Sequence, residues 1–511
     1  MNPRLERSVY AIAGLVTLVT VLRPFWVATY PPMTDLPFHA AQTSILRHYL
    51  DPAWHFREQF ELRPIAVPYA SSYALGALFM LVLPAVQAVK AATAVMLLML
   101  PLGLGTLAWG MRKTPLLGLL ALPFAWCNLT HWGFVNFVAS LGLFAAVLGL
   151  TMRALDVPTR RTQAALAATL VLLFFTHVFR FPFALLGMAV VTLALYPLTR
   201  RVAPAAWPTL PALGLFASFW LARPKAVGGH ELELTFEWAR REQLLELVIG
   251  SFNDPAEADA AKLHLVVAGL AAAAGVAAKI VTRRSLERAD LRWEGLATLA
   301  VLVNVIGLFA GFLTLPMEIG VWWYVFPREA TAVLFVAMAL VPDLPKHAFP
   351  RLAVVALMSW SGWRASSVAA ENWAKFDATT RDFDAVTEAI PQAPRLLYLV
   401  FDHTGSTRKQ TPYIHLPAYV QATRGGHLSF HFAMWDAGLV RYRRDPGAIV
   451  PPAVPLRWEW QPARFRVREH GPFFDWFLVR SKTDPGRLFE ADPAIIPVKH
   501  GGTWWLYRRA P

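Results

Sequence analysis

Charged residues are scarce in this sequence. They make up 16% of its 511 residues, against about 25% in soluble globular domains, and 56% of the residues are hydrophobic. The shortage lies between residues 8 and 370, where long apolar runs alternate with short polar segments. The composition therefore excludes a uniformly soluble chain. It predicts a membrane domain at residues 1–370 and a water-exposed domain at residues 371–511.

Other features are missing as well. Cys127 is the single cysteine, which excludes an intramolecular disulfide. No small-x-small cleavage site follows the apolar run at residues 8–22, so we expect an uncleaved first span. The chain has no internal repeat, no low-complexity tract and no G-x-S-x-G motif, and the missing nucleophile motif disfavours a soluble hydrolase.

The net charge of +14 is distributed in short basic clusters between apolar runs. This distribution is typical of cytoplasmic loops and not of a nucleic-acid groove, so no nucleic-acid partner is expected. The basic segments predicted to face the cytoplasm are 153–161, 199–204, 282–293 and 343–351. Segments 30–68 and 222–262 then face outward, and the domain at 371–511 is extracytoplasmic.

The apolar runs predict 11–13 transmembrane helices, because a helix needs about 20 apolar residues to cross a bilayer. The candidate runs are 8–29, 70–88, 91–110, 115–130, 133–152, 164–180, 183–198, 205–221, 263–281, 295–314, 329–343 and 352–370. One conflict arises at Arg112 and Lys113. Either one run within 70–110 lies in the membrane interface, or this basic pair faces outward.

The last 140 or so residues, 371–511, have an α/β pattern. The predicted elements are strands at 395–401, 428–433, 474–480 and 503–508 and a helix near 417–423. The predicted fold class is an α-helical polytopic membrane protein with a C-terminal extracytoplasmic α/β domain. The expected location is a bacterial inner membrane.

Four outward segments carry scarce ionisable residues. In the first, Asp35 and His39 are four residues apart and share a face if the segment is helical. A carboxylate and an imidazole in this arrangement can bind a divalent metal or pair as a base and its orienting partner. The alternative is an interfacial helix with a solvated polar face, which we favour for His48 and His55.

The second segment is the polar, aromatic turn around His131, where Gly133 allows close approach of another backbone. The third contains His177 and Arg180 at the outer boundary of the membrane, where ionisable side chains usually face a cavity or a partner. The alternatives are a tryptophan-rich interfacial hairpin for His131 and snorkelling to lipid headgroups for Arg180.

The fourth segment runs from Pro316 to Glu329 and contains Glu318 and Arg328. A guanidinium at the position of Arg328 suits a lipid-linked phosphate, because it presents paired donors to phosphate oxygens. The alternative is an ion pair between Arg328 and Glu329. We expect the candidate residues of all four segments to meet in one outward cavity.

This arrangement resembles the GT-C superfamily of membrane glycosyltransferases over roughly residues 1–370. The position of Asp35 after the first span looks like that family's acidic position. The resemblance implies that Asp35 is the general base or a metal ligand, and that Arg328 and Arg180 hold a carrier phosphate. His39, His131, His177 and Glu318 complete the candidate site. Many members have a second acidic residue where this chain has Leu36, so metal dependence stays open.

The leading hypothesis is therefore transfer of a sugar, with inversion at its anomeric carbon, from a polyprenyl-phosphate donor to an extracytoplasmic acceptor. The expected partners are this lipid-linked donor and membrane lipids. A transporter or flippase of a lipid-linked glycan is the first alternative. It predicts paired halves and charges near the midplane, neither of which the sequence shows. A non-catalytic membrane scaffold is the second alternative, and it predicts that Asp35→Asn is silent.

Overall fold

The computed structural model describes residues 3–63, 67–222, 232–282, 288–320, 322–403, 408–409, 412–435, 438–455 and 457–510. The chain divides into two compact units. Unit 1 contains residues 1–24, 94–130 and 134–369, and unit 2 contains residues 25–93, 131–133 and 370–511. Unit 2 thus groups the C-terminal residues with most of segment 30–68, the first outer segment.

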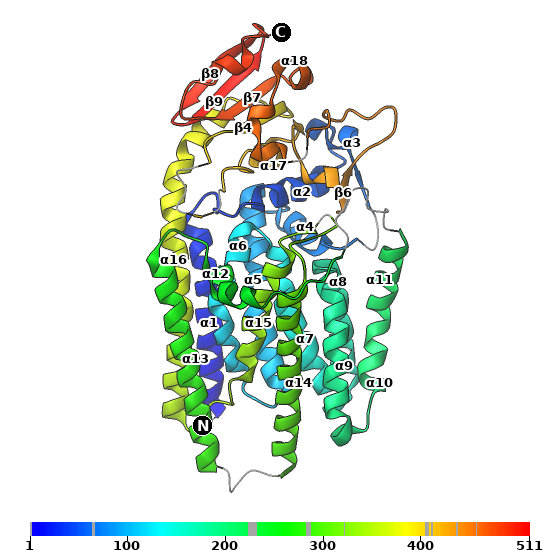
Figure 1. Ribbon diagram of the computed structural model, residues 1–511, viewed down its shortest axis with the longest axis vertical. Helices are drawn as coiled ribbons and strands as arrows, with labels where there is room; N and C mark the ends of the chain where they lie inside the picture. The colour runs from blue at the N-terminus through cyan, green and yellow to red at the C-terminus, as the bar shows by residue number, and fades with distance from the viewer. Residues whose placement is uncertain are drawn as a thin grey trace. The chain divides into compact units, whose positions relative to one another are not determined.

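Unit 1 is built almost entirely of helices (Figure 1). Its α-helices, four of which (α1, α5, α6 and α16) continue into unit 2, are α1 (Pro3–Val27), α5 (Ala85–Gly110), α6 (Asn128–Trp132), α7 (Val135–Asp156), α8 (Arg160–Thr176), α9 (Arg180–Thr199), α10 (Ala203–Ala206), α11 (Leu210–Ala222), α12 (Leu244–Ile249), α13 (Pro255–Thr282), α14 (Arg288–Thr314), α15 (Val325–Ala337) and α16 (Ala348–Thr387). Its 3-10 helices and short strands are η2 (Pro115–Trp126), η3 (Trp207–Thr209), η4 (Trp238–Gln243), η6 (Met338–Leu340), β2 (Glu318–Ile319) and β3 (Trp322–Trp323).

Within the described residues, seven helices are long and apolar enough to cross a membrane, so this is a multi-pass membrane fold. They are Arg4–Val27, Ala85–Gly110, Val135–Asp156, Arg180–Thr199, Ala203–Ala222, Pro255–Val281 and Asp290–Thr314. This number is below the expected 11–13. Several predicted runs form shorter helices, such as the 17-residue α8, or the 12-residue η2.

Helices α5 and α7 pack with their backbones in direct contact. A Cβ atom at Gly103 would lie 1.9 Å from the carbonyl oxygen of Gly142, and one at Gly110 would lie 2.5 Å from that of Gly149. The two glycines on each helix are seven residues apart and therefore share a face. Small residues at such a contact permit the close packing that stabilises helix pairs in membranes.

The conflict at Arg112 is resolved by its ion pairs. Its guanidinium lies 2.8 Å from Asp156, at the end of α7, and 2.6 Å from Asp290, at the start of α14. Arg112 therefore shares one end of unit 1 with the segments predicted to be cytoplasmic. The run at 70–110 supplies one crossing, since the separate helix at Ala70–Phe79 has only 10 residues, about 15 Å.

Unit 2 combines the first outer segment with the C-terminal α/β region. Its helices are α2 (Leu36–His48), α3 (Phe56–Gln59), α4 (Ala70–Phe79), α17 (Ala418–Arg424), α18 (Val467–His470), η1 (Pro52–Trp54), η7 (Phe432–Trp435), η8 (Trp458–Trp460), η9 (Pro462–Arg464) and η10 (Gly486–Phe489). Its strands are β1 (Phe60–Leu62), β4 (Arg395–Val400), β5 (His427–Leu428), β6 (Val440–Tyr442), β7 (Trp476–Arg480), β8 (Ile495–Gly501) and β9 (Trp504–Arg509).

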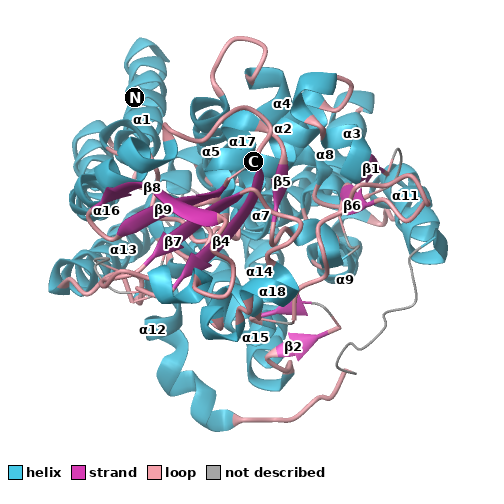
Figure 2. Cartoon of the chain, turned by 90° about the horizontal axis from the view of Figure 1, so that it is seen from above, coloured by secondary structure: helices cyan, strands magenta, loops and turns pink. Residues whose placement is uncertain are grey.

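The five-stranded sheet of unit 2 has the order β5-β4-β7-β9-β8. Strand β4 pairs in parallel with β5 and β7, and β9 pairs antiparallel with β7 and β8 (Figure 2). The predicted strands at 395–401, 474–480 and 503–508 are confirmed, whereas the strand predicted at 428–433 shortens to β5. The edge strand β8 was not predicted, because Pro497 and a register shift interrupt its alternating pattern.

Two contacts join the first outer segment to the C-terminal region. Helix α17 packs on α2 (Figure 1), and β1 pairs antiparallel with β6 from Phe60 opposite Tyr442 to Leu62 opposite Val440. Ile45, Phe56 and Phe60 form a fully buried cluster at this junction. The segment that carries Asp35 is therefore held by residues almost 400 positions later in the chain.

Candidate functional site

The backbone around Asp35 is fixed by the turn at residues 131–133. The amides of Thr34 and Asp35 donate hydrogen bonds to the carbonyl oxygens of His131 and Trp132, at 3.0 and 3.1 Å. Gly133 has a φ of +90°, and a Cβ atom there would lie 2.7 Å from the Asp35 nitrogen. The predicted close approach at Gly133 is confirmed, and it serves to position the candidate catalytic carboxylate.

The side chain of Asp35 contacts a histidine that the sequence did not single out. Its Oδ1 atom lies 3.1 Å from Nδ1 of His415, which also lies 3.1 Å from the carbonyl oxygen of Thr34. Because both neighbours of Nδ1 are acceptors, this nitrogen carries the proton. The Asp35 side chain is 17% exposed and that of His415 is 6% exposed. The pair therefore lies at an accessible but largely desolvated position.

Aromatic rings hold the His415 imidazole in place. The ring centroids of Phe38 and Phe432 lie 4.7 and 5.6 Å from it, and Phe430 stacks on it at 6.1 Å with an interplanar angle of 22°. Such packing fixes the direction of the bond to Asp35. His415 lies in the turn just before α17, and its partner Asp35 is 380 positions away, so no local pattern could pair them.

His39 does not pair with Asp35. Its Nδ1 lies 3.0 Å from the Tyr73 hydroxyl and its Nε2 lies 3.1 Å from the carbonyl oxygen of Gly133. Burial lowers the pKa of His39, with the charge of Asp35 opposing this effect. A neutral imidazole with both nitrogens bonded ties α2 to α4 and to the 131–133 turn. The ring nitrogens of His39 therefore contact Tyr73 and Gly133 and not the Asp35 carboxylate, and its catalytic role stays a prediction.

His131 is fully buried, and its Nε2 accepts a hydrogen bond of 3.2 Å from the indole nitrogen of Trp373. Its carbonyl oxygen holds Thr34. The Arg408 guanidinium, 3% exposed, donates to the carbonyl oxygen of Pro32 and lies 3.5 Å from the Thr34 hydroxyl. These contacts place His131 in the support of the 32–35 segment and add Arg408 to that support.

The candidate residues of unit 1 form a second group. One guanidinium nitrogen of Arg328 lies 3.4 Å from Nε2 of His177, and the others donate to the carbonyl oxygens of Tyr324 and Trp323, at 3.1 and 2.9 Å. The guanidinium carbon lies 4.3 Å from the Phe134 ring centroid. The guanidinium of the half-buried Arg328 is therefore oriented by four neighbouring residues, and its positive charge lies beside the His177 imidazole.

Arg180 has a different environment. Its guanidinium makes a two-pronged pair with Glu329, at 3.0 and 2.7 Å, and both side chains are 0% exposed. The alternative pairing of Glu329 with Arg328 does not occur. A guanidinium with this buried partner is committed to holding α9 against α15, so we do not retain Arg180 among the phosphate ligands.

Glu318 lies in the short hairpin of β2 and β3, where it is opposite Trp323. This hairpin leads into Tyr324, whose carbonyl oxygen accepts a hydrogen bond from Arg328. Glu318 is half-buried. Its place is therefore next to the Arg328 group. The structure brings Asp35, His39 and His131 together in unit 2 and His177, Arg328 and Glu318 together in unit 1, and one shared cavity stays a prediction.

The described residues contain no group of three or more His, Cys, Asp or Glu side chains arranged to hold a metal ion. Asp35 contacts one imidazole through Nδ1, which carries a proton. A protonated nitrogen cannot coordinate a metal. The arrangement makes Asp35 a candidate general base with an orienting histidine.

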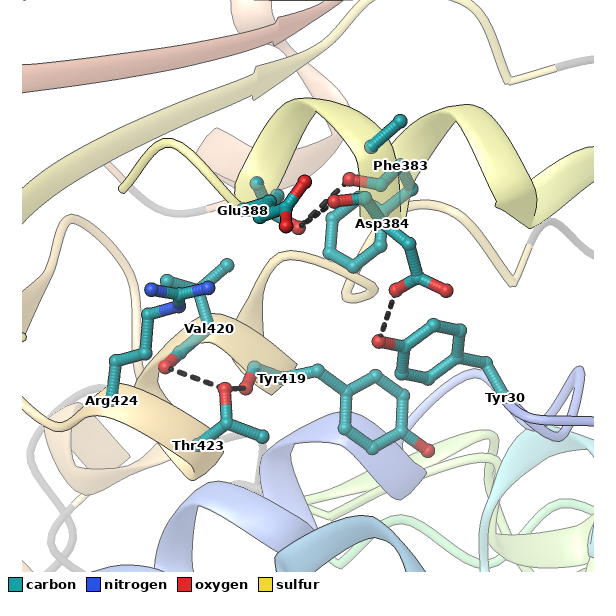
Figure 3. A pocket seen from close by; sticks show the side chains of 10 residues that line it. Tyr30, Phe383, Asp384, Glu388, Tyr419, Val420, Thr423 and Arg424 are labelled. Atoms are coloured by element: carbon teal, nitrogen blue, oxygen red, sulfur yellow. Dashed lines mark hydrogen bonds between the residues drawn. The ribbon is translucent and has the colours of Figure 1, made fainter. Parts of the chain in front are cut away.

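Unit 2 also contains a cleft of about 400 Å³ between α16 and α17 (Figure 3). Figure 3 shows Tyr30 directed at Asp384, to which its hydroxyl donates at 2.5 Å. Asp384 and Glu388 are exposed, and Arg424 is bonded to the carbonyl oxygen of Ile390. Exposed carboxylates along a helix are typical of a solvated face, so we do not assign chemistry to this cleft.

No protein-family model and no curated protein matches the sequence. The fold, in contrast, matches solved structures. The crystal structure of ArnT from Cupriavidus metallidurans bound to undecaprenyl phosphate aligns over 100% of this chain and 99% of its own, with a TM-score of 0.55 and 12% identity. The apo structure of ArnT covers 99% and 98%, with a TM-score of 0.54 and 13% identity. The expected architecture is therefore confirmed at the level of the fold, which this chain shares with ArnT over its whole length.

Proposed function

We propose that this protein is a membrane glycosyltransferase that moves a sugar from a polyprenyl-phosphate donor to an extracytoplasmic acceptor. The observation that carries the proposal is the Asp35–His415 pair on a fold shared with ArnT, which has been crystallised with undecaprenyl phosphate. A desolvated carboxylate held by an imidazole is suited to remove a proton from an acceptor hydroxyl.

The proposed reaction is a single inverting displacement. Asp35 takes the proton of the acceptor hydroxyl while the acceptor oxygen forms a bond to the anomeric carbon. The bond between that carbon and the phosphate oxygen breaks, and polyprenyl phosphate leaves with the electron pair. His415 keeps the carboxylate oriented through its Nδ1 proton. Arg328, if its unit presents it to the same cavity, stabilises the negative charge that develops on the phosphate.

The test is transfer of labelled sugar in membranes supplied with undecaprenyl-phosphate-linked pentoses and hexoses. Asp35→Asn should reduce the rate by about 10²- to 10⁴-fold, the usual contribution of a general base. The matched control is Asp51→Asn in the same outer segment, because Asp51 only caps the helix at Pro52–Trp54 through Ala53 and asparagine caps equally well. Equal rates for wild type and Asp35→Asn would contradict the proposed role of Asp35 as general base.

We further propose that unit 2 faces the extracytoplasmic side of a bacterial inner membrane, as the basic loops indicate. Labelling can test this cleanly, because the single cysteine, Cys127, is buried. A cysteine introduced at Glu469, whose side chain is 72% exposed, should react with a membrane-impermeant maleimide in intact spheroplasts. Reaction only after lysis would place unit 2 in the cytoplasm.

A further inference from the structure

The direction of the Arg328 guanidinium depends on the backbone of Tyr324. Nε of Arg328 donates a hydrogen bond of 3.1 Å to the Tyr324 carbonyl oxygen. Tyr324 precedes α15 with a φ of 64° and a ψ of 42°, a left-handed conformation that a bulky residue adopts only where its surroundings hold it. The contacts that hold Tyr324 therefore decide where its carbonyl oxygen lies and where Arg328 points.

Tyr324 is held through its side chain, which is buried. Nδ2 of Asn128 donates a hydrogen bond of 3.2 Å to the Tyr324 hydroxyl. The ring of Phe134 lies 6.1 Å from the Tyr324 ring and also covers the Arg328 guanidinium at 4.3 Å. Ring packing lets a phenol slide along its neighbour, whereas a hydrogen bond fixes both a distance and a direction. The bond from Asn128 therefore fixes the position of the phenol.

The same amide nitrogen of Asn128 reaches α12. It donates a second hydrogen bond, of 3.3 Å, to the carbonyl oxygen of Leu247, and Asn128 is 3% exposed. Leu247 belongs to the long outer segment 222–262, and α12 packs against α15, the helix that contains Arg328. We call these two hydrogen bonds the Asn128 bridge. The bridge joins the outer segment to Tyr324 and, through Tyr324, to Arg328.

The outer end of the Asn128 bridge is itself anchored. Arg240 lies in η4, directly before α12, and is 6% exposed. Its guanidinium donates hydrogen bonds of 3.3 and 2.6 Å to the carbonyl oxygens of Phe312 and Leu315, at the end of α14. Arg240 also forms an ion pair with Glu237. Because these contacts hold the start of α12 against α14, the Leu247 carbonyl gives the bridge a fixed end.

Backbone carbonyl oxygens occupy two nitrogens of Arg328, since Nε bonds Tyr324 and Nη2 bonds Trp323. A guanidinium is a planar fork of five N–H donors, so fixing two of its nitrogens also fixes the direction of the remaining donors. A displacement of about 1 Å in such a group weakens its action on a ligand strongly. A change at Asn128 should therefore reach a bound phosphate through Tyr324 and Arg328.

We propose that Asn128 is a positioning residue, whose amide holds Tyr324 so that Arg328 points at the phosphate of the lipid carrier. The inference deepens the proposed glycosyl transfer and rests on it for the identity of the ligand. It also gives the outer segment a part in substrate binding, because Leu247 in α12 accepts the other bond of the Asn128 amide.

The test compares the binding of undecaprenyl phosphate and undecaprenol to the full chain in the same detergent micelles, followed by tryptophan fluorescence. The preference for the phosphate, taken as the ratio of the two dissociation constants, isolates the contact with the phosphate and needs no turnover. Arg328→Gln should reduce this preference by about 10- to 100-fold, the usual effect of a lost hydrogen bond to a charged group. Asn128→Ala and Tyr324→Phe should each reduce it by about tenfold. The double variant should reduce it no further, since both changes remove the same hydrogen bond.

The matched control is Asn304→Ala. Asn304 is another buried asparagine of unit 1, and its Nδ2 donates a hydrogen bond of 2.9 Å to the carbonyl oxygen of Ala300 in its own helix. This variant should keep the preference of the wild type. In the background of Arg328→Gln, Asn128→Ala should have no further effect, and an additional loss there would contradict an action through Arg328.

A merely structural role of Asn128 would weaken the binding of both lipids equally. That result, an unchanged preference in Asn128→Ala, or a wild type without any preference for the phosphate would overturn the proposal, even if sugar transfer is detected. A reduced preference in Asn128→Ala, together with a wild type that transfers no sugar, would retain the positioning role and remove the proposed reaction.

Discussion

The buried pair of Arg180 and Glu329 provides a quantitative test of how unit 1 is held together. Both side chains are 0% exposed, and the two contacts of 3.0 and 2.7 Å leave each group with one dominant partner. Arg180→Met removes the guanidinium and leaves a carboxylate in an apolar helix bundle. Breaking one side of such a pair costs about 3–5 kcal/mol, because the remaining charge stays desolvated and uncompensated.

The double variant Arg180→Met with Glu329→Leu replaces both charges by apolar groups of similar volume. Such replacements are commonly neutral or stabilising. The coupling between the two substitutions should therefore be about 3 kcal/mol or more in favour of the double variant. The assay is the unfolding equilibrium of the detergent-solubilised chain, followed by tryptophan fluorescence as sodium dodecyl sulfate replaces the mild detergent.

The same variants separate a structural role of Arg180 from the predicted role in phosphate binding. If the pair only holds α9 against α15, the double variant should regain wild-type stability and sugar transfer together. If Arg180 holds the carrier phosphate, the double variant should fold but remain inactive. Additive destabilisation by the two single substitutions would refute the reasoning, because independent side chains show no coupling.

Two further predictions concern the fold. Gly142→Leu should prevent accumulation of folded protein, because even a Cβ atom there would lie 2.0 Å from the carbonyl oxygen of Met99. The matched control is Gly307→Leu, since nothing lies within 4 Å of the Cβ position at Gly307. Equal yields of the two variants in membranes would contradict the α5–α7 packing. Burial lowers the pKa of His431 to about 3 and that of His427 to about 4, from 6.5. Between pH 6.5 and about 4 the unfolded chain then binds protons that the folded chain does not, so the stability of unit 2 should fall as the pH falls, by up to about 1.4 kcal/mol per pH unit for each histidine. His431→Gln should make the pH dependence measured by thermal unfolding shallower, and an unchanged slope would show that His431 titrates normally in the fold.

The pattern of residues predicted well what depends on local composition. Apolar runs between basic clusters indicated a multi-pass membrane protein, and β-branched and aromatic runs indicated β4, β7 and β9. The helix near residues 417–423 was predicted because Gly425 and Gly426 follow it, and both have positive φ angles. Helix lengths were predicted less well, because apolar composition alone does not tell where a helix breaks.

The candidate site was predicted only in part. Asp35 was singled out because a carboxylate and an imidazole four residues apart follow the first span, and Gly133 because glycine permits a close approach. The residue that contacts the Asp35 carboxylate, His415, was missed. Its local sequence is that of an ordinary soluble domain, in which a histidine is unremarkable. The pairing of Asp35 with His39 was wrong, because a four-residue spacing on a helix does not exclude other partners.

The sequence by itself determined the class of the protein, the separation of apolar and globular regions, and Asp35 as the carboxylate to examine. These properties follow from hydrophobicity and from the cost of a charge beside lipid, both of which act residue by residue. Only the tertiary structure decided that residues 25–93 belong with the C-terminal region, that His415 holds Asp35, and that Arg180 is committed to Glu329. Such contacts join positions 149–380 residues apart, and they depend on the packing of whole elements, which no local pattern encodes.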